Sequence, residues 1–550
     1  MFKLSRNEQG QFIFFGDGDQ TVAASIAEEA GLAHSITASR KYGFPVYFTD
    51  TPYAVLHLRE FADDRAAPFL DPLALAWDAS RKTASDFAVP SPEGRIPRPF
   101  QRAFVEFAAP RKNILLGDAP GLGKTIQAIL LANIKGYKRV LVICPATVRL
   151  HWAKFVREWS TIPNVLAYPV LQSSDGVHPK ANYVITSYEV ARDGLWSVLM
   201  GYEWDLIVID EAHFLKTPDS GRTRALFGGG AKRFKEGGIT SRAGQILALT
   251  GTPLPNRPRE GYTLARALDW ESIDWQTFTQ FKERYNPGGQ SVSVSPVTGK
   301  VTRYVWEHVG RLPELNARLR CNFMCRRLKE DVLHDLPPKE YELTYVETTG
   351  AILRALRAEH LLGIDPDDLI NNGFSFDGGE VATVRRLMGE AMVPQVVEHC
   401  KTLLDGGVDK LVIGAYHASV IDTLSYMLRD YGVLVIDGRT PVRQRQGGQF
   451  SRVEQFKHNP DYRVIIIQIL TAPGIDGLQD TASHIVLAEP DWVPGNNEQL
   501  IDRLHRMGQV GSVLAQFMVA KGSLAEYIIG KAIDKAHTVH KVLDAKPLKG

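Results

Sequence analysis

A glycine-rich stretch at residues 117–125, GDAPGLGKT, has the residue types of a phosphate-binding loop. The strict pattern G-x-x-x-x-G-K-[ST] requires glycine at position 118, where this chain has Asp118. The stretch follows an apolar run and precedes a helical one, so backbone N–H groups and a helix N-terminus would point at an anion. Lys124 would reach the β- and γ-phosphates of a nucleotide, and Thr125 would give its hydroxyl to Mg²⁺. The alternative is an ordinary glycine-rich turn, against which the lysine and threonine in register argue.

A pair of carboxylates follows 86 residues after Lys124, in the run LIVIDEAH. Asp210 and Glu211 end an apolar strand, and ligands of parallel α/β sheets bind at that carboxyl edge. Nucleotide hydrolysis needs one carboxylate to hold Mg²⁺, a role that fits Asp210, and another to orient or deprotonate water, which fits Glu211. Such a pair alone is usually a solvated turn, so the prediction depends on its pairing with the phosphate loop.

Two arginines stand three residues apart in QLIDRLHRMGQ, residues 499–509. On a helix, Arg503 and Arg506 would share one face. Arginine supplied by a second domain neutralises the charge that develops on a transferring phosphoryl group. A solvated helix face is the alternative, and the stretch by itself does not decide between them.

The elements that must position these residues form two α/β series. Short apolar runs with turn signals after them predict parallel strands buried on both faces, at NILLG, RVLVIC, NYVIT, DLIVID and QILALT, and again at KLVIGA, GVLVI, YRVIIIQ, HIVLAE and VLAQFMV. A helix is expected at 420–428, and the intervening residues 262–400 look mostly helical, with a polar loop at 286–300. The first 90 residues show short alternating runs and an apparent helix at 51–64, and a proline-rich linker follows at 89–101.

Composition excludes several classes of protein. The 550 residues are 44% apolar and 23% charged, with four cysteines, which argues against a disulfide framework and for a reducing compartment. No apolar run is long enough to span a membrane, and the first residues lack the apolar core of a signal peptide. The net charge is +2, divided into −4 over residues 1–90 and +6 over the remainder, so any grip on nucleic acid is expected beyond residue 90 and in local patches.

Taken together, these stretches resemble the Snf2 branch of the superfamily 2 helicases, from about residue 97 to 540. The family commonly has aspartate where Asp118 stands, so the loop departs from the generic pattern in the family's own manner. Within the branch, residues 251–264, 391–407 and 410–424 resemble the annealing-helicase group, in a compact bacterial or phage form. The further motifs that carry the resemblance are RPFQRAFVEF, VICPATVRLHW, VITSYE, LTGTPLPNRPRE, RRLKEDVLHDLPPK, DGRT and QILTAPGIDGLQDTASHIVLAEP.

The resemblance implies a fold and a division of the chain. The fold class is α/β, with two RecA-like P-loop lobes built on parallel sheets, helical insertions between them and a small α+β N-terminal domain. The expected divisions are an accessory domain of unknown role at 1–90, an ATP-binding first lobe at 97–265, Snf2-type insertions and an inter-lobe linker at 266–400, a second lobe at 401–522, and a brace helix and tail at 523–550.

The resemblance also implies site residues. Catalysis would fall to Lys124, Asp210, Glu211, Arg503 and Arg506, with Mg²⁺ held by Thr125 and Asp210. Gln101 would contact the adenine. The other residues expected to bind ATP are Asp118, Ala119, Pro120, Gly121, Leu122, Gly123, Lys124, Thr125 and Gln499, and those expected to contact DNA are Thr147, Ser187, Thr440 and Thr471.

By the same resemblance, the chain is expected to be a DNA-dependent ATPase that translocates on duplex or forked DNA and rewinds strands or remodels forks. Its cofactors would be ATP and Mg²⁺, and its partners DNA and single-stranded-DNA-binding or replication proteins. It would act as a monomer in the cytoplasm of a bacterial or phage-infected cell, or in the nucleus of a eukaryote. A strand-separating DNA or RNA helicase and an ATP-gated nucleic-acid-binding scaffold remain open as alternatives.

The sequence holds several weaker signals besides these motifs. Basic stretches at 222–242 and 318–329 would either grip DNA or be solvated faces, and the sequence favours neither. Cys321 and Cys325 lack a second pair for zinc and are expected in the core. His213 and His505 are expected to orient neighbours, and Trp152 and Trp204 to pack rather than stack on bases.

Overall fold

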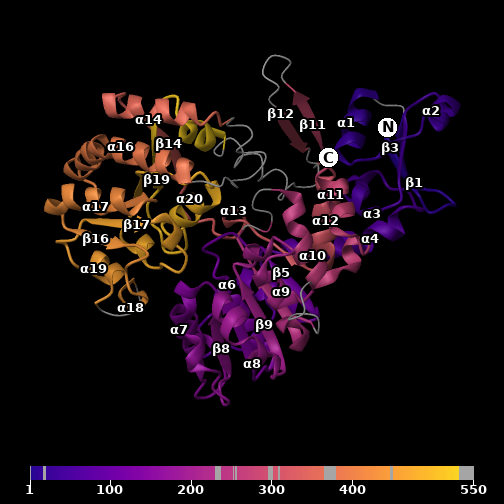
Figure 1. Ribbon diagram of the computed structural model, residues 1–550. Helices are drawn as coiled ribbons and strands as arrows, with labels where there is room; N and C mark the ends of the chain where they lie inside the picture. The colour runs from indigo at the N-terminus through magenta and orange to yellow at the C-terminus, as the bar shows by residue number, and fades with distance from the viewer. Residues whose placement is uncertain are drawn as a thin grey trace.

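The computed structural model describes residues 2–16, 20–229, 237–251, 253, 257–294, 301–307, 310–364, 379–445 and 450–531. Figure 1 shows two α/β lobes, one magenta and one orange, and a third mass in which the indigo N-terminal domain meets the helices of the insertion. The two lobes carry separate parallel sheets, which confirms the expected fold class. Parts of the expected segments lie outside the described residues: 532–550 of the expected brace helix and tail (523–550), 230–236 of one basic stretch and 295–300 of the polar loop.

The first lobe is a seven-stranded parallel sheet in the order β13-β5-β10-β9-β6-β8-β7. All five predicted strands are present. The sequence reading missed β7 and β13, which are three and two residues long. The strands are β5 (Asn113–Leu116), β6 (Val140–Cys144), β7 (Ala167–Pro169), β8 (Tyr183–Ser187), β9 (Trp204–Asp210), β10 (Ala243–Leu249) and β13 (Met324–Cys325), and the helices are α5 (Pro99–Ala108), α6 (Lys124–Lys135), α7 (Arg149–Trp159), α8 (Trp196–Met200) and α9 (Gly221–Phe227).

Apolar side chains explain why these runs become central strands. Alternate residues of β6 enter two different cores, with Leu141 and Ile143 on one face and Val140 and Val142 on the other. A strand buried on both faces needs helices above and below the sheet, and parallel connections supply them. The carboxyl ends of β5 and β9 therefore meet at one edge, which is where the predicted site residues stand.

The second lobe is a six-stranded parallel sheet in the order β14-β19-β18-β15-β17-β16. All five predicted strands are present, and the sixth, β14, comes from residues expected to lie in insertions and linker. The predicted helix at 420–428 is confirmed by α17. The strands are β14 (Lys339–Val346), β15 (Leu411–Ala415), β16 (Val433–Ile436), β17 (Val464–Gln468), β18 (His484–Leu487) and β19 (Val513–Ala520), and the helices are α14 (Gly350–Leu361), α16 (Gly379–Asp405), α17 (Ala418–Met427), α18 (Val442–Arg445), α19 (Arg452–His458) and α20 (Pro494–Ile501).

The N-terminal domain is an antiparallel sheet in the order β1-β2-β4-β3, covered by helices. The predicted helix at 51–64 was wrong in extent, because the chain forms a short α3 and then a 3₁₀ turn at Leu56–Phe61. The elements are β1 (Phe2–Arg6), β2 (Phe12–Gly16), β3 (Ala33–His34), β4 (Val46–Thr49), α1 (Gln20–Glu29), α2 (Ile36–Tyr42), α3 (Pro52–Val55) and α4 (Ala67–Arg81).

The region between the lobes contains helices and one antiparallel hairpin. The sequence reading expected a polar loop at 286–300, and the structure has β11 and β12 paired there in register. Alternation of serine and valine in QSVSVS is a period-two signal for a strand, which the polarity of the segment concealed. The elements are α10 (Tyr262–Asp269), α11 (Phe278–Tyr285), β11 (Gly288–Val294), β12 (Val301–Glu307), α12 (Leu312–Asn322) and α13 (Lys329–Val332).

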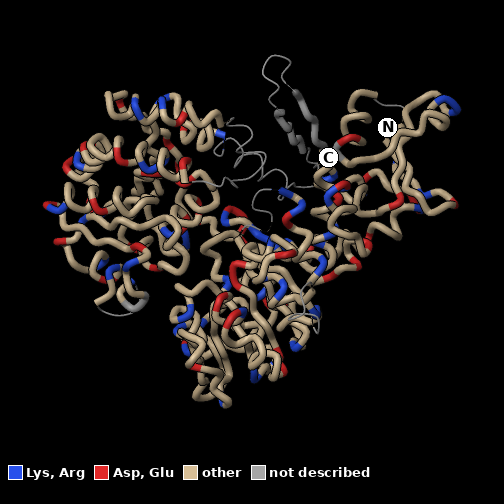
Figure 2. The backbone as a smooth tube through the Cα atoms, in the orientation of Figure 1, with Lys and Arg blue, Asp and Glu red and all other residues tan. Residues whose placement is uncertain are grey.

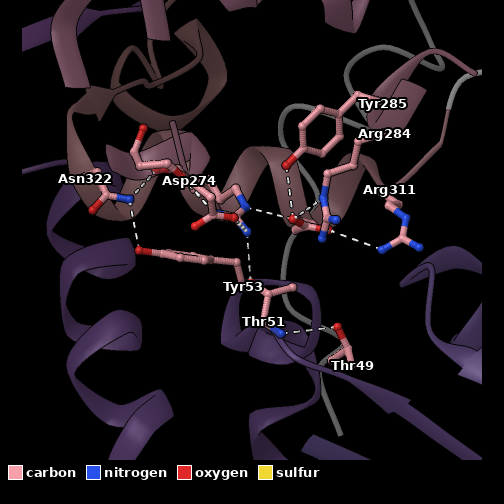
Figure 3. Close-up of polar contacts among 11 residues, drawn as sticks. Thr49, Thr51, Tyr53, Asp274, Arg284, Tyr285, Arg311 and Asn322 are labelled. Atoms are coloured by element: carbon pink, nitrogen blue, oxygen red, sulfur yellow. Dashed lines mark hydrogen bonds and ion pairs between the residues drawn. The ribbon is translucent and has the colours of Figure 1, made fainter. Parts of the chain in front are cut away.

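A buried charge network on α12 joins this insertion to the N-terminal domain (Figure 3). Glu314 is fully buried and accepts hydrogen bonds from Arg284, Tyr285 and Arg318 at 2.7–3.0 Å. Arg318 reaches onward to the hydroxyl of Thr51 at 3.2 Å. The network fixes the N-terminal domain against the first lobe's insertion.

No helix in the described part of the chain combines the length and apolarity that crossing a membrane requires.

Candidate nucleotide site between the two lobes

The phosphate loop connects β5 to α6 and depends on two glycines in the left-handed region. Gly121 has φ 88° and Gly123 has φ 72°. A Cβ on Gly121 would lie 2.8 Å from Cβ of Arg506, and a Cβ on Gly123 would lie 2.9 Å from Nε2 of Gln101. Both positions therefore exclude a side chain by backbone conformation and by space. Gln101, predicted to read the adenine, is buried directly behind the loop.

The ammonium group of Lys124 lies inside the curve of the loop. It donates to the carbonyl oxygen of Asp118 at 2.8 Å and to that of Ala119 at 3.4 Å. Burial lowers the pKa of Lys124, while the charges of Glu211 and Asp210 act in the opposite direction. The loop lysine and the two predicted carboxylates are thus close enough to interact.

Asp118 lies behind the loop. Its carboxylate is fully buried and accepts from Nε of Arg327 at 3.0 Å, from Nη2 of Arg327 at 2.5 Å and from Nε2 of Gln127 at 3.1 Å. The residue that departs from the strict loop pattern, Asp118, therefore anchors the loop to Arg327 and Gln127. The prediction that Asp118 helps to bind the nucleotide stays a prediction. Its buried carboxylate could contribute only by holding the loop in place.

The carboxylate pair stands at the end of β9, and its neighbours hold each member differently. Asp210 accepts from Nε1 of Trp152 at 2.8 Å, and burial together with the charge of Glu211 raises its pKa. Glu211 has φ 53°, unusual for a residue with a side chain, and lies 3.3 Å from Nδ1 of His213. Burial alone would raise the pKa of Glu211, but the hydrogen bond and charge of His213 and the charge of Lys124 lower it.

The two arginines approach this site from the second lobe. Helix α20 ends at Ile501, so Arg503 and Arg506 stand on turns, and the helical face considered for them was wrong. Nε of Arg503 is buried and has no hydrogen-bond partner among the described residues. Burial and the charge of Arg506 lower the pKa of Arg503 to about 10, and the charge of Glu211 opposes this shift. A residue of the second lobe therefore acts electrostatically on the first lobe's carboxylate.

The remaining nucleotide-site predictions fall on the same edge. Ala119 and Leu122 are buried beside Phe100 and against Met507 of the second lobe. Pro120 lies against Gly251, where a Cβ would come 2.7 Å from the proline ring. Thr125 stands in the first turn of α6, and Gln499 lies on α20, before the arginines.

The four residues predicted to contact DNA carry hydroxyls that bond inside the protein. Thr147 donates across the lobes to the carbonyl oxygen of Pro473 at 3.0 Å. Ser187, Thr440 and Thr471 are buried and bond to their own or neighbouring loops. Contact with DNA through these three side chains would require a rearrangement, and their role stays a prediction.

The basic stretch at 318–329 is neither a solvated face nor a DNA surface, so both readings of it were wrong. Arg318, Arg320, Arg326 and Arg327 are all buried and bonded to protein groups. Composition cannot show this, because a buried arginine is identified by its partners. Over the described backbone, basic and acidic residues are interspersed on both lobes (Figure 2).

Three supporting residues escaped the sequence reading or were given a weaker role. Trp152 packs, as expected, but also orients Asp210. His213, expected to orient a neighbour, lies beside Glu211 and 3.1 Å from the hydroxyl of Thr250. Arg327 lies in a recognised motif, but the sequence did not show its role, because its partner Asp118 is 209 residues away. Cys321 and Cys325 are buried free thiols, as expected.

The predicted metal ligands, the hydroxyl of Thr125 and the carboxylate of Asp210, are of the kind that bind Mg²⁺ together with a nucleotide. No group of three or more His, Cys, Asp or Glu in the described ranges could hold a metal ion. Mg²⁺ that shares phosphate oxygens needs only one or two protein ligands, and a hydroxyl with a carboxylate meets that need. Thr125 and Asp210 remain the residues predicted to hold it.

The chain is similar to known proteins over most of its length. A protein from Xenopus tropicalis, SWI/SNF-related matrix-associated actin-dependent regulator of chromatin subfamily A-like protein 1, is 30% identical over 441 residues, covering 78% of this chain and 43% of the relative. DNA annealing helicase and endonuclease ZRANB3 from Bos taurus is 27% identical over 470 residues, covering 82% and 41%. The chain spans less than half the length of these two relatives.

A solved structure, the Sulfolobus solfataricus SWI2/SNF2 ATPase core in complex with dsDNA, aligns with TM-score 0.38 at 18% identity, covering 85% of this chain and 96% of that one. The model of the SNF2-related domain matches residues 72–355, which is more than half of the sequence. With a phosphate loop and carboxylate pair in one lobe and two arginines supplied by another, the chain belongs to the SNF2-related domain family.

Proposed function

We propose that this chain is an ATP-dependent DNA translocase of the Snf2 type, which hydrolyses ATP to move along duplex or branched DNA. One observation carries the proposal: the second lobe supplies Arg506 against Gly121 of the phosphate loop, and Arg503 beside Glu211. A site made by two lobes links turnover to their closure, and closure changes how each lobe holds a polyanion. We take the predicted lobes 97–265 and 401–522 as the two moving parts, with β13 joined to the sheet of the first and β14 to that of the second.

The residues present fit a triphosphate. Two left-handed glycines allow close approach of backbone, and the partnerless Nε of Arg503 is a buried donor suited to an anion. Gln101, whose Nε2 lies beside Gly123, is the proposed adenine contact. Magnesium, held by Thr125 and Asp210, would neutralise charge on the phosphates.

The protein groups then divide the work. Lys124 withdraws from its loop carbonyls to bind phosphate oxygens as a point charge. Glu211 is held ionised by its neighbours, so it is suited to orient the attacking water. Arg503 and Arg506 stabilise charge that develops as the phosphoryl group transfers. Positioning and charge stabilisation account for the rate, with little covalent chemistry.

The proposed track is duplex or forked DNA, held mainly through phosphates and therefore without strong sequence preference. Thr147, Ser187, Thr440 and Thr471 are the proposed contacts by motif position. The name of the relative ZRANB3, a DNA annealing helicase, supports strand rewinding or fork remodelling as the outcome of movement. We extend the proposal to a monomer that meets single-stranded-DNA-binding or replication proteins in the cytoplasm of a bacterial or phage-infected cell, or in a eukaryotic nucleus.

The test is the ATPase rate of the full chain with duplex, single-stranded and forked DNA and with RNA. We expect duplex or forked DNA to stimulate turnover most. Stimulation by RNA alone would contradict DNA translocation, and ATP-dependent strand separation without rewinding would favour a helicase.

A loop variant makes the test specific. Lys124→Ala should lower turnover by at least about 100-fold, because it removes the positive charge at the phosphates, while circular dichroism shows the fold retained. Lys135→Ala, at the far end of the same helix, is the matched control and should keep the wild-type rate. A wild-type rate in Lys124→Ala would refute the assigned role, and a biological role that survives Glu211→Gln would favour an ATP-gated scaffold.

A further inference from the structure

A five-residue segment runs beside the phosphate loop on its way to the second lobe. Its residues are 325–329, and we call it the coupler segment. The carbonyl oxygens of Cys325 and Arg327 accept hydrogen bonds from the N–H groups of Gly117 at 2.8 Å and Ala119 at 3.0 Å. The segment therefore continues the pairing of β13 with β5 along the loop itself.

Two arginine side chains strengthen this attachment. Arg326 donates to the carbonyl oxygens of Gly117 at 2.6 Å and Gly251 at 3.2 Å. Arg327 pairs with the carboxylate of Asp118, and both side chains are almost completely buried, at 1% and 0% exposed. A buried pair of this kind keeps one geometry, because separating its charges in the interior is costly. The coupler segment and the loop are thus expected to move as one body.

Lys329, the last residue of the coupler segment, contacts the second lobe. Its Nζ donates to Oδ1 of Asp502 at 2.7 Å and to the carbonyl oxygen of His505. The side chains of Lys329 and Asp502 are 10% and 8% exposed. Cε of Lys329 also lies 3.6 Å from where a Cβ on Gly121 would be, so the side chain passes along the loop before it crosses.

Asp502 directly precedes Arg503 in a turn that follows the end of α20. Although burial alone would raise the pKa of Asp502, the ammonium groups of Lys329 and Lys339 hold it well below its ordinary value. Lys339, on β14, contacts Asp502 at 3.2 Å from within the second lobe. The chain passes from one lobe to the other between Lys329 and Lys339. The carboxylate of Asp502 therefore contacts the lysine on each side of this crossing.

We propose that Lys329 is a positioning residue which, through Asp502, holds Arg503 beside Glu211 when the lobes close. The inference rests on the proposed ATPase function and adds a connection to it. A shift of the loop moves the coupler segment through Asp118 and Arg327, and Lys329 transmits that shift to the turn that bears the arginine. The alternative is a tie that stabilises the lobes against each other without affecting the reacting groups.

The experiment measures kcat and KM for ATP with saturating duplex DNA. Lys329→Gln should lower kcat by about 10-fold or more and change KM by less than about threefold, because positioning acts in the transition state. Lys329→Arg, which keeps the charge, should recover most of the rate. Arg59→Gln removes an exposed ion pair with Asp71 in the N-terminal domain and should retain the wild-type rate.

A second background separates positioning from mere stability. In an Arg503→Ala chain, Lys329→Gln should cost less than about twofold, because the residue through which it acts is gone. Equal losses in both backgrounds, a wild-type kcat in Lys329→Gln, or no recovery in Lys329→Arg would overturn the inference. If the wild-type chain itself shows no ATP turnover with any nucleic acid, the proposed function fails instead, and that outcome is read from the wild type alone.

Discussion

Nη1 of Arg506 donates to Oδ1 of Asp476 at 2.8 Å, within the second lobe, while Cβ of Arg506 lies 2.8 Å from where a Cβ on Gly121 of the first lobe would be. The guanidinium of Arg506 is thus held by a carboxylate of its own lobe, while the start of the side chain lies beside the phosphate loop. Arg503, three residues earlier, interacts with Glu211, and its Nε has no hydrogen-bond partner in the part of the chain that the structure describes. The two arginines are therefore placed by different contacts around one site.

Arg506→Ala should lower kcat by at least about 100-fold and change KM for ATP little, since the charge it supplies is needed most in the transition state. Steady-state ATPase kinetics with duplex DNA measure both constants. Arg429→Ala, which removes an exposed arginine from the same lobe, is the control. An unchanged kcat in Arg506→Ala would contradict the placement.

Gly121→Ala should abolish ATP turnover and leave the lobes folded, because its Cβ would collide with Arg506 and its φ of 88° disfavours a side chain. Gly94→Ala is a matched control: its φ is 75°, and a Cβ there meets nothing within 4 Å. Both variants place a side chain at a positive φ, so both bear the same kind of backbone strain. Only Gly121→Ala adds a collision between the two lobes. Equal turnover in the two variants would show that the lobes do not meet at Gly121 during the reaction.

Trp152→Phe should move the acid limb of the kcat profile to higher pH. The hydrogen bond from Trp152 stabilises ionised Asp210, so its loss raises further a pKa that burial and Glu211 already raise to about 6. More of the carboxylate is then protonated at a given acidic pH. The expected displacement is about one pH unit or less. Trp159→Phe, on the same helix, is the control, and an identical shift there would rule out the contact with Asp210 as the cause.

Glu314→Gln should loosen the N-terminal domain. The substitution removes the buried carboxylate of Glu314 from Arg318 and Arg284, while Arg318 keeps its pair with Asp274 at 2.6 Å. The expected cost is therefore below the roughly 3–5 kcal/mol lost when a buried charge is left with no partner. Faster proteolysis between residues 82 and 98 and a lower first unfolding midpoint are the expected readouts. Glu203→Gln breaks an exposed pair with Arg242 and should leave both unchanged. Normal protease resistance in Glu314→Gln would show that apolar contacts alone fix the domain.

The sequence by itself determined the two parallel sheets and predicted the main site residues. Buried parallel strands are short apolar runs between turn signals, and a phosphate loop needs glycines, lysine and threonine at fixed spacing. Both are local patterns, so Lys124 and the carboxylate pair at the end of β9 could be predicted without coordinates. The same local reading misjudged QSVSVS, because a polar strand lacks the apolar run on which the prediction relied.

Only the tertiary structure decided what supports the site. Asp118 appeared as an irregular loop position until its partner Arg327 was seen, and Lys329 appeared as one charge in a basic stretch until Asp502 stood beside it. These pairs join residues more than 170 positions apart. An ion pair depends on distance and burial in space, and composition along the chain records neither.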